Sequence, residues 1–358
     1  MGIIHLHIRI RNGKDYFSFL RIRMCNPMIT AKDIARELNL SQPTVSRILN
    51  GDEGHRAAQA TRERVWEAAQ RLGYQPNAVA RSLRRGRTDI IGVHTSHNYD
   101  VRNDFLGAIV GALQCACAER HLDVMLHSGL YGSRAETMYG KLRDGRVDGL
   151  ILHSSAGDPL AELLRESSLP VVAVADALPG FAAVTCDDAT GMKALVDLLW
   201  SRGHRKFAYL APHANLPSVE KRRHVFESEL QSRGVEAENR VIKRLDFENS
   251  APVVAELRAQ GPLAVCCWND KTAYNLLHEC LVQGVRVPQE MAVAGFDGLR
   301  DEKLPARVLA TVRCPWDEVA MRALDVLVQL IESRGENGTA DIVGEICLPV
   351  SVLDGDTI

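Results

Sequence analysis

From position 89 onward the sequence alternates short apolar runs with segments of helical periodicity, and this alternation constrains the fold more than any other feature. The apolar runs occupy residues 90–94, 122–126, 149–153, 171–175, 206–210, 263–267 and 291–295. Helical patterns lie between them, and in residues 105–121 one face carries Leu106, Ile109, Val110, Leu113 and Ala116. Strands that alternate with helices form parallel sheets covered by helices, so we expect an α/β body. Ligands of such sheets bind at the carboxyl ends of the strands.

A different pattern occupies residues 30–51, where two short helices are predicted around a tight polar turn. Thr30 and Asp33 have the spacing of a capping box at the start of the first helix. Ser41 precedes the second helix, whose first turn accepts Pro43. Two helices joined in this way form a helix-turn-helix unit, whose second helix places its first turns in the major groove of DNA. A plain helical hairpin with solvated polar side chains is the alternative interpretation.

The polar side chains of this unit are the candidates for DNA contact. Glutamine can pair with adenine through two hydrogen bonds, and arginine can do the same with guanine. The candidate DNA-contacting residues are Thr30, Ser41, Gln42, Pro43, Thr44, Ser46, Arg47 and Asn50, whereas Val45 and Leu49 are expected to face the core. A third helix is predicted over residues 61–72, with a buried face of Val65, Ala68, Ala69 and Leu72.

The formal net charge of −2 hides a division along the chain. Residues 1–27 hold 5 basic and 1 acidic side chains, and residues 28–87 hold 11 and 6. Residues 88–358 hold 27 basic and 38 acidic side chains, so a basic head precedes an acidic body. A basic head suits a module that binds the phosphates of a nucleic acid. Solvated surface charge would give the same pattern, so the charge supports the helix-turn-helix prediction without establishing it.

Composition and motifs disfavour several classes of protein. No apolar run approaches the ~20 residues that a membrane helix needs, and no secretory signal is recognisable, so a cytoplasmic protein without a membrane partner is expected. The 9 cysteines include no Cys-x-x-Cys pair, which favours buried free thiols over disulfides or zinc. No glycine-rich nucleotide loop, nucleophile elbow or His-Glu-x-x-His motif is present, which argues against an enzyme. Neither a cofactor nor a metal is expected.

Residues 1–27 are basic and apolar, but they contain neither a continuous hydrophobic stretch nor a small-residue cleavage site. We interpret them as an extension that arises from an upstream start site, with translation beginning at Met24 or Met28. The reason is that Met28 directly precedes the first capped helix.

Two further segments complete a pattern that resembles the lac repressor (LacI/GalR) family. The third helix runs into Leu72-Gly-Tyr-Gln-Pro-Asn-Ala-Val-Ala-Arg-Ser-Leu-Arg-Arg-Gly-Arg-Thr88, which is soon followed by Ile91-Gly92-Val93. Helix-turn-helix, third helix, Pro-Asn turn, short helix and first strand come in the family's order and spacing. The likeness extends at lower identity to about residue 355. The resemblance implies a regulator that binds operator DNA as a homodimer and responds to a small-molecule effector.

The resemblance implies a hinge helix at about residues 77–85 that orders only on operator DNA, where pairs of such helices cross the minor groove. Leu83 stands where the family inserts an apolar side chain between base pairs and kinks the duplex. The other DNA-contacting residues implied here are Asn77, Ala80, Arg81 and Arg84, and Arg85 and Arg87 would also meet phosphates. Packing of Leu83 within its own helix is the alternative, but too few apolar residues surround it.

The resemblance also implies a periplasmic-binding-protein-like effector domain, which consists of two parallel-sheet subdomains joined by three crossovers. The expected division is an extension over 1–27, an all-α helix-turn-helix domain over 28–76, a hinge over 77–87, and an effector-binding and dimerisation domain over 88–358. The first subdomain would comprise about 88–187 and 315–341, and the second about 188–312 and 342–358. The tail lacks leucine heptads, so a dimer rather than a tetramer is expected.

Polar residues that follow the predicted strands match the family's effector-contacting positions. The candidate effector-binding residues are Ser96, Asn98, Asp100, Asp176, Ser218, Arg222, Phe247, Trp268, Asn269 and Asp297. Their carboxylate, guanidinium and amide groups suit the hydroxyls of a sugar, under which an aromatic ring could lie. Capping of the next helix is the alternative role for the strand-end residues. Asp188 is interpreted mainly as structural, and Val225 stands where the family has glycine, so the helix near Arg222 is expected to pack slightly differently.

The sequence therefore predicts an effector-controlled transcription regulator, most simply a repressor that a sugar or sugar derivative releases from its operator. A purine-type corepressor would invert the response and is the first alternative. An enzyme or other small-molecule-binding α/β protein without DNA function, and a secreted sugar-binding protein, are further alternatives that the basic head disfavours.

Overall fold

The computed structural model describes residues 3–6, 20–23, 29–51, 57–97, 103–127, 134–213, 216–245, 251–299, 307–333 and 344–358. Contacts divide the chain into two compact units, Met1–Arg87 and Thr88–Ile358. Each unit is described by itself. No helix among the described residues is long and apolar enough to span a membrane.

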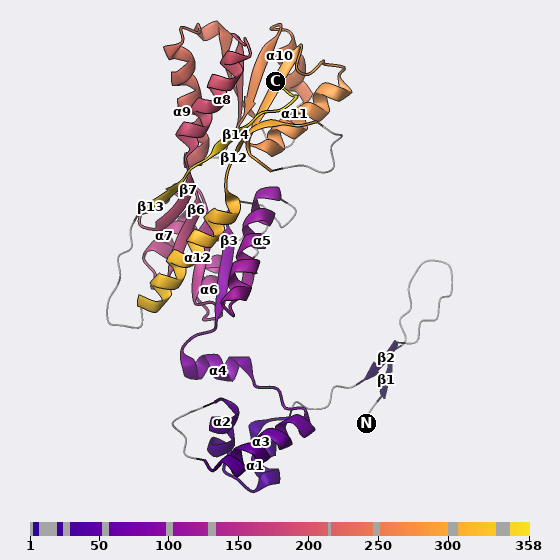
Figure 1. The fold of residues 1–358 in the computed structure, drawn as a ribbon, viewed down its shortest axis with the longest axis vertical. Coiled ribbons are helices and arrows are strands. Elements are labelled where there is room, and N and C mark those ends of the chain that lie inside the picture. The colour runs from indigo at the N-terminus through magenta and orange to yellow at the C-terminus, as the bar shows by residue number, and fades with distance from the viewer. Residues whose placement is uncertain are drawn as a thin grey trace. The chain divides into compact units, whose positions relative to one another are not determined.

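Among its described residues, the first unit contains four helices and one short strand pair, which are labelled in Figure 1. The helices are α1 Ala31–Leu38, α2 Gln42–Leu49, α3 Gln59–Leu72 and α4 Ala78–Arg85. The strands β1 Ile3–Leu6 and β2 Leu20–Arg23, which were not expected, pair antiparallel. The third helix begins at Gln59 rather than at the expected Thr61, because the turn that Ala58 opens is already helical. Helices α1, α2 and α3 enclose a core of Ile34, Ala35, Val45, Ile48, Leu49, Val65, Ala68 and Ala69.

Local hydrogen bonds set the ends of the first two helices, as the sequence predicts. The backbone N–H of Thr30 donates to Asp33 Oδ2 over 3.0 Å, and Thr30 Oγ1 donates to the same oxygen over 2.6 Å. Ser41 Oγ accepts a hydrogen bond from the backbone N–H of Thr44 at the start of α2, over 3.3 Å. At the end of α2, Asn50 is the capping residue and its side-chain amide donates to the carbonyl of Ser46.

Replacing Ser41 by alanine is expected to destabilise the first unit by about 1 kcal/mol, because the N–H of Thr44 loses its acceptor. Hydrogen exchange of the α2 amides in the full-length protein measures this loss. Gln42→Ala is the matched control, since Gln42 is exposed and its side chain caps nothing in the described structure. Equal exchange rates in the two variants would show that the cap does not stabilise α2.

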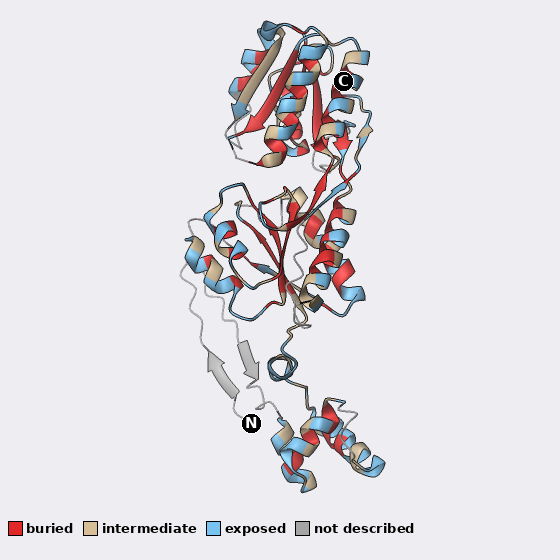
Figure 2. Ribbon diagram, turned by 90° about the vertical axis from the view of Figure 1, so that its left-hand side faces the viewer, coloured by how far each residue is buried: buried red, intermediate tan, exposed pale blue. Residues whose placement is uncertain are grey.

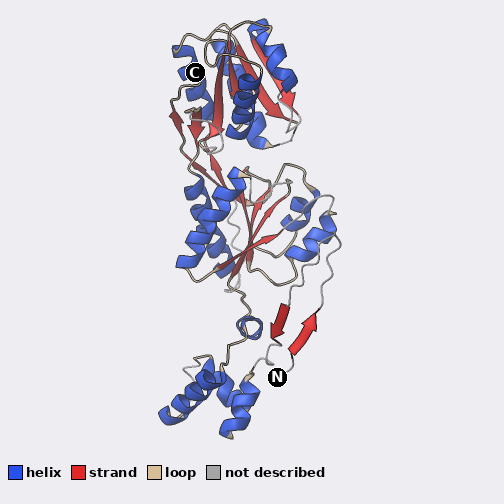
Figure 3. Cartoon of the chain, turned by 90° about the vertical axis from the view of Figure 1, so that its right-hand side faces the viewer, coloured by secondary structure: helices blue, strands red, loops and turns tan. Residues whose placement is uncertain are grey.

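The second unit contains two six-stranded sheets with helices on both faces (Figure 3). The first sheet has the order β13-β7-β6-β5-β3-β4 and is entirely parallel. Its strands are β3 Ile90–Thr95, β4 Asp123–His127, β5 Gly149–His153, β6 Val171–Ala175, β7 Ala182–Cys186 and β13 Glu345–Leu348. Its helices are α5 Asp104–Glu119, α6 Ala135–Leu142, α7 Pro159–Arg165 and α12 Trp316–Ser333, of which α12 packs against α5, β5, β6 and β7.

The second sheet has the order β14-β12-β11-β10-β8-β9, and only its edge strand β14 is antiparallel. Its strands are β8 Phe207–Pro212, β9 Arg240–Leu245, β10 Leu263–Cys267, β11 Met291–Asp297, β12 Ala310–Arg313 and β14 Ser351–Leu353. The helices of this half are α8 Asp188–Ser201, α9 Pro217–Ser232, α10 Ala251–Arg258 and α11 Asp270–Val282, with the short 3-10 helix Ala237–Asn239 before β9. Buried residues concentrate on the strands of both sheets (Figure 2).

All seven strands expected from the apolar runs are present, and their ends differ from the expected ones by at most two residues. One expectation about the tail is wrong. Residues 342–358 were assigned to the second subdomain as a whole, but β13 pairs with β7 in the first sheet and only β14 joins the second. The chain therefore crosses between the sheets at β7–α8, at β12–α12 and at β13–β14.

The cysteines of the described residues are free thiols. Burial is confirmed for Cys117, Cys186, Cys266, Cys267, Cys280 and Cys314. Cys115 and Cys347 are exposed, so for these two the expectation of burial is wrong.

Candidate functional site

Six of the ten predicted effector-binding residues lie around one cavity at the carboxyl ends of both sheets. The cavity is partly open to solvent. It is lined by Asn103, Phe105, His153, Ala175, Asp176, Leu216, Ser218, Arg222, Trp268, Asn269, Asp297 and Trp316. The parallel strands of each sheet end at the same edge, and these two edges supply most of the polar lining.

The other four predicted residues divide into two groups. Ser96 does not line the cavity; it is exposed and its Oγ accepts a hydrogen bond from Ser154 over 3.0 Å. Asn98, Asp100 and Phe247 lie outside the described residues.

Sequence reasoning missed six lining residues, namely Asn103, Phe105, His153, Ala175, Leu216 and Trp316. His153 and Ala175 are the last residues of β5 and β6, so the strand-end rule could have found both. Asn103 caps α5, where it accepts a hydrogen bond from the N–H of Leu106 over 3.1 Å. Trp316 begins α12, which is distant in the sequence from the strands β5, β6 and β7 that it packs against, and no local pattern signals that contact.

Arg222 is the centre of the polar wall. It lies in the second turn of α9 and is 4% exposed. Its Nε donates to Asp188 Oδ1 over 2.7 Å, and its Nη1 donates to the carbonyl of Trp268 over 2.7 Å. Asp297 Oδ1 lies 3.7 Å from Nη1, and the guanidinium stacks 3.7 Å from the centroid of the Phe296 ring. Burial lowers the pKa of Arg222, but the two carboxylates more than reverse this effect, so the guanidinium stays charged.

The valine that precedes Phe226 does not displace Arg222. Val225 packs at a half-buried position against the main core, and Phe226 is completely buried. The expected structural role of Asp188 is borne out by its buried ion pair with Arg222.

Two acidic groups, one in this wall and one behind it, resist ionisation. Burial raises the pKa of Asp297 well above its ordinary value, and Arg222 only partly offsets that effect. Burial likewise raises the pKa of Asp270 to about 7, although Thr311 and the N–H of Leu299 donate hydrogen bonds to its carboxylate. Gly295 makes room for this carboxylate, since a Cβ there would lie 2.2 Å from Asp270 Oδ1.

Asp176 joins the two halves of the unit across the cavity. Its Oδ1 accepts a hydrogen bond from the backbone N–H of Ser218, in the first turn of α9, over 2.6 Å. Its Oδ2 lies 3.7 Å from His153 Nε2. Burial raises the pKa of Asp176, but the nearby His153 ring and the hydrogen bond from Ser218 hold it below its ordinary value of 3.8. Capping of the next helix is the alternative role for the strand-end residues. Asn269 does cap the next helix, where it accepts from the N–H of Thr272, whereas Asp176 binds a helix of the opposite half.

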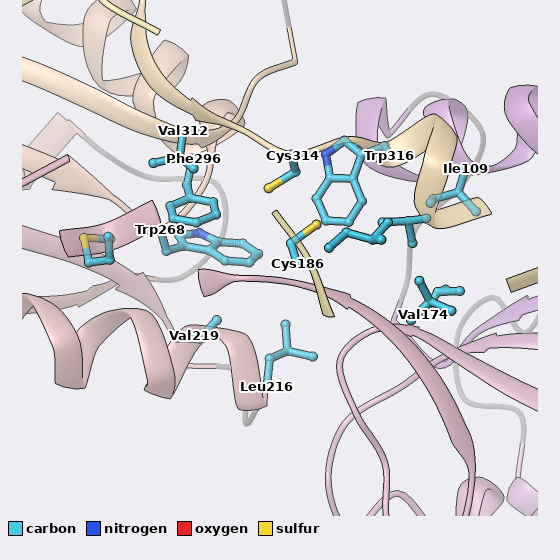
Figure 4. Packing of buried hydrophobic residues seen from close by; sticks show 14 of the residues in the cluster. Ile109, Val174, Cys186, Leu216, Val219, Trp268, Phe296, Val312, Cys314 and Trp316 are labelled. Atoms are coloured by element: carbon cyan, nitrogen blue, oxygen red, sulfur yellow. The ribbon is translucent and has the colours of Figure 1, made fainter. Parts of the chain in front are cut away.

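Aromatic side chains form the apolar walls. Trp268 and Trp316 are 8% and 5% exposed, and the ring of Phe105 lies edge-on to Trp316 with 4.8 Å between centroids. Figure 4 shows Trp268 on one side and Trp316 on the other, with Cys186 and Cys314 between them. Trp268 therefore forms one aromatic wall of the cavity and Trp316 forms a second one, and both lie near the polar residues at the strand ends.

Two strained backbone positions lie at this cavity. Among the described residues, five that are not glycine have positive φ, and two of them, Ala175 with φ 68° and Asp297 with φ 131°, line the cavity. Strained backbone persists where surrounding contacts determine it, and it clusters at ligand sites. The strain thus agrees with the placement of the site.

The histidines near the first sheet's edge make stability depend on pH. Burial is the main cause that lowers the pKa of His94, His127 and His97, the last to about 4. Below pH 6.5 the unfolded chain binds a proton that folded His97 does not, so stability falls as pH falls from 6.5 toward 4.

His97→Gln is expected to reduce the loss of stability between pH 7.5 and 5.5 by about 1 kcal/mol. Urea unfolding at both pH values measures it. His121→Gln is the control, and identical losses in the two variants would contradict the assignment.

The predicted DNA-contacting residues of α2 lie on its outer face. Ser41, Gln42, Pro43 and Arg47 are exposed and Thr44, Ser46 and Asn50 are half-buried, whereas Val45, Ile48 and Leu49 are buried as expected. Thr30 is exposed at the start of α1. The polar side chains of the helix-turn-helix are therefore not part of its hydrophobic core.

Helix α4 presents an apolar side chain to solvent. Asn77 caps it by accepting from the N–H of Ala80 over 3.2 Å, and Gly86 ends it with φ 67°. Leu83 is 82% exposed, and Ala80, Arg81 and Arg84 are also exposed. The alternative in which Leu83 packs within its own helix does not hold in this structure, because the side chain remains largely solvated.

The fold and the site define a class of protein: a helix-turn-helix module followed by a two-lobed, ligand-binding α/β domain. A family model described as bacterial regulatory proteins of the lacI family matches residues 30–77, and one described as a periplasmic binding protein-like domain matches residues 196–357. The regulator GalS of Salmonella typhimurium is 30% identical over 331 residues, which are 89% of this chain and 94% of that protein. The repressor PurR of Vibrio atlanticus is 28% identical over 318 residues, 86% of this chain and 93% of that protein. The chain belongs to the lacI family and is a DNA-binding transcription regulator, not an enzyme.

Solved structures agree with this fold. The lac repressor dimer bound to operator and the anti-inducer ONPF superposes with a TM-score of 0.77 at 21% identity, covering 92% of this chain and 99% of that one. The complex of the transcriptional regulator CelR with cellobiose gives a TM-score of 0.65 at 25% identity, with coverage of 92% and 99%.

Proposed function

We propose that this regulator is a cytoplasmic repressor that binds a pseudo-palindromic operator as a homodimer and is released by a small carbohydrate. The observation that carries the DNA-binding part is Leu83, which is 82% exposed on a short helix rich in arginine. A solvated leucine between cationic side chains suits insertion between base pairs while the arginines meet phosphates. One helix-turn-helix buries too little surface to hold an operator well, which supports a dimer.

The cavity supports the effector part of the proposal. Asp176, Asp297 and Asn269 offer groups that bond hydroxyls, and Trp268 and Trp316 offer apolar faces against which a sugar ring can lie. The cavity lies between the two sheets, and Asp176 already bridges them through the N–H of Ser218. A ligand held by both halves would favour their closed arrangement. DNA release is then a population shift, which requires the effector to prefer one state by several kcal/mol.

The test is a gel shift with DNA from upstream of the protein's own operon, titrated with salt and then with sugars. We expect tight binding at low salt, with an affinity that falls steeply as salt rises, because each neutralised phosphate releases counterions. A sugar that binds the cavity should weaken operator binding. Absence of DNA binding at low salt would contradict the proposed repressor.

A purine-type corepressor is the second candidate. The observation that favours it is the pair of aromatic walls, Trp268 and Trp316, which could enclose a planar base. In that case the ligand would strengthen operator binding in the same gel shift. The sign of the ligand's effect therefore separates the two candidates.

A further inference from the structure

We propose that the cavity selects an uncharged or cationic, hydroxyl-bearing effector and rejects phosphorylated and carboxylated compounds. This inference rests on the proposed function of the cavity as the effector site, and it adds the charge of the ligand. It follows from the balance of charged groups in and behind the walls of the cavity.

Carboxyl groups outnumber cationic groups in the lining. Asp176 and Asp297 supply two carboxyl groups, and Arg222 is the one permanently cationic side chain among the described residues that line the cavity. His153 is also present, but its Nε2 already faces Asp176 at 3.7 Å. An anionic ligand would thus enter a site in which carboxyl groups outnumber guanidinium groups.

The positive charge of Arg222 is already neutralised. Its Nε is bonded to Asp188 over 2.7 Å, its Nη1 is bonded to the carbonyl of Trp268 over 2.7 Å, and Asp297 lies 3.7 Å away. A phosphate binds arginine well when both prongs of the guanidinium fork are free. Here Nε and Nη1 are both engaged, so a phosphate could make a two-pronged contact only by displacing the buried Asp188 carboxylate or the Trp268 carbonyl.

The carboxyl groups in and behind the wall show how strongly this buried site disfavours a negative charge. Burial raises the pKa of Asp297 far above its ordinary value, and neighbouring Asp270 and Asp188 raise it further. Burial also raises the pKa of Asp188 itself, although Arg222 contacts it directly. Where resident carboxyl groups resist ionisation, a further anion from solution is strongly disfavoured.

A donor-rich neutral ligand matches the groups that remain. The carboxyl oxygens of Asp176 and Asp297 accept hydrogen bonds, so they suit hydroxyl or ammonium donors on the ligand. Asn269 uses its carbonyl oxygen to cap α11, which leaves its amide as a donor toward the cavity. Free sugars, polyols and amino sugars present such hydroxyls, and sugar phosphates add an anion that no side chain here is arranged to receive.

The test compares matched pairs of ligands on the full-length protein. The probes are glucose and glucose 6-phosphate, galactose and galactose 1-phosphate, ribose and ribose 5-phosphate, glucosamine, gluconate, and the bases guanine and hypoxanthine. Thermal shift identifies binders and calorimetry measures their affinities. We expect at least one uncharged sugar or glucosamine to bind, and its phosphate to bind at least about 10-fold more weakly, which is 1.4 kcal/mol.

The outcomes separate this inference from the proposed function. A sugar phosphate or gluconate that binds as tightly as the neutral sugar overturns the inference about charge. The proposed function as a carbohydrate sensor would still hold. A purine base that binds when no sugar does refutes the carbohydrate sensor and leaves the charge selection standing. Binding by none of these compounds contradicts both.

A charge variant tests the cause of the selection. Asp188→Asn removes the carboxylate charge that neutralises Arg222 and should narrow the gap in affinity between a neutral sugar and its phosphate. Asp270→Asn, which removes charge further behind the wall, should narrow the gap less and serves if the first variant does not fold. Glu227→Gln is the control, because this residue lies on the same helix as Arg222 but pairs with Arg223 near the surface. A purely structural role for Asp188 would lower both affinities equally, and that result would overturn the assigned cause.

Discussion

Replacing Arg222 by methionine is expected to lower the free energy of unfolding by about 3–5 kcal/mol. The variant keeps most of the buried volume but removes the cation that Asp188 and Asp297 face, and both carboxyl groups are buried. It also removes the hydrogen bond that Arg222 donates to the carbonyl of Trp268. Urea unfolding of the full-length protein at pH 7.5 measures the effect.

Arg223→Met is the matched control for Arg222. Arg223 is the next residue of the same helix and pairs with Glu220 and Glu227, at a position where its side chain is 28% exposed. Partly solvated ion pairs contribute about 0–1 kcal/mol, so this variant should lose far less stability. Similar losses in the free energy of unfolding for the two variants would show that the buried network around Arg222 stabilises the protein no more than an ordinary surface ion pair does.

Replacing Leu83 by serine is expected to weaken operator binding by about 10- to 100-fold, because the variant cannot insert an apolar wedge between base pairs. The side chain is 82% exposed, so the stability of the protein should change by less than about 0.5 kcal/mol. A quantitative gel shift at fixed salt measures DNA affinity, and calorimetry with the sugar identified in the ligand panel measures effector affinity. Effector affinity should be unchanged.

Leu83→Met is the matched control, since methionine retains an apolar side chain of similar volume and should keep most of the affinity. Two results would count against the wedge. One is equal DNA affinity for the serine and methionine variants. The other is a parallel loss of DNA and effector affinity, which would indicate that the two roles are not separate.

Much of the architecture was predictable because its signals are local. The seven apolar runs became strands, since runs of four to six apolar residues between helical segments suit a sheet buried on both faces. The cap at Ser41 was predictable for the same reason, because acceptor and donor are three residues apart. The predicted runs did not include β7, β9, β12 and β13. Strands β9 and β13 lie at sheet edges, and β7 and β12 are short and contain small or polar residues, so their apolar pattern is weak.

The sequence could predict which polar residues line the candidate site, but not which residues contact one another there. The strand-end rule and the family resemblance named Asp176, Arg222 and Asp297, all of which line the cavity. No sequence rule indicated that Asp176 would cap a helix of the opposite half, or that Trp316 would complete the wall. These contacts join residues on different elements, and their geometry depends on how the two sheets are held by three crossovers.

The sequence by itself determined the alternation of strands and helices, the capped helix pair and the arginine-rich segment around Leu83, since each depends on neighbours within a few turns of chain. The tertiary structure alone decided which charges meet. Asp188 and Arg222 are 34 residues apart, yet they form a buried ion pair. Burial strengthens electrostatic interactions and penalises unpaired charge, so the pairing that folding imposes determines what charge a ligand is allowed to carry.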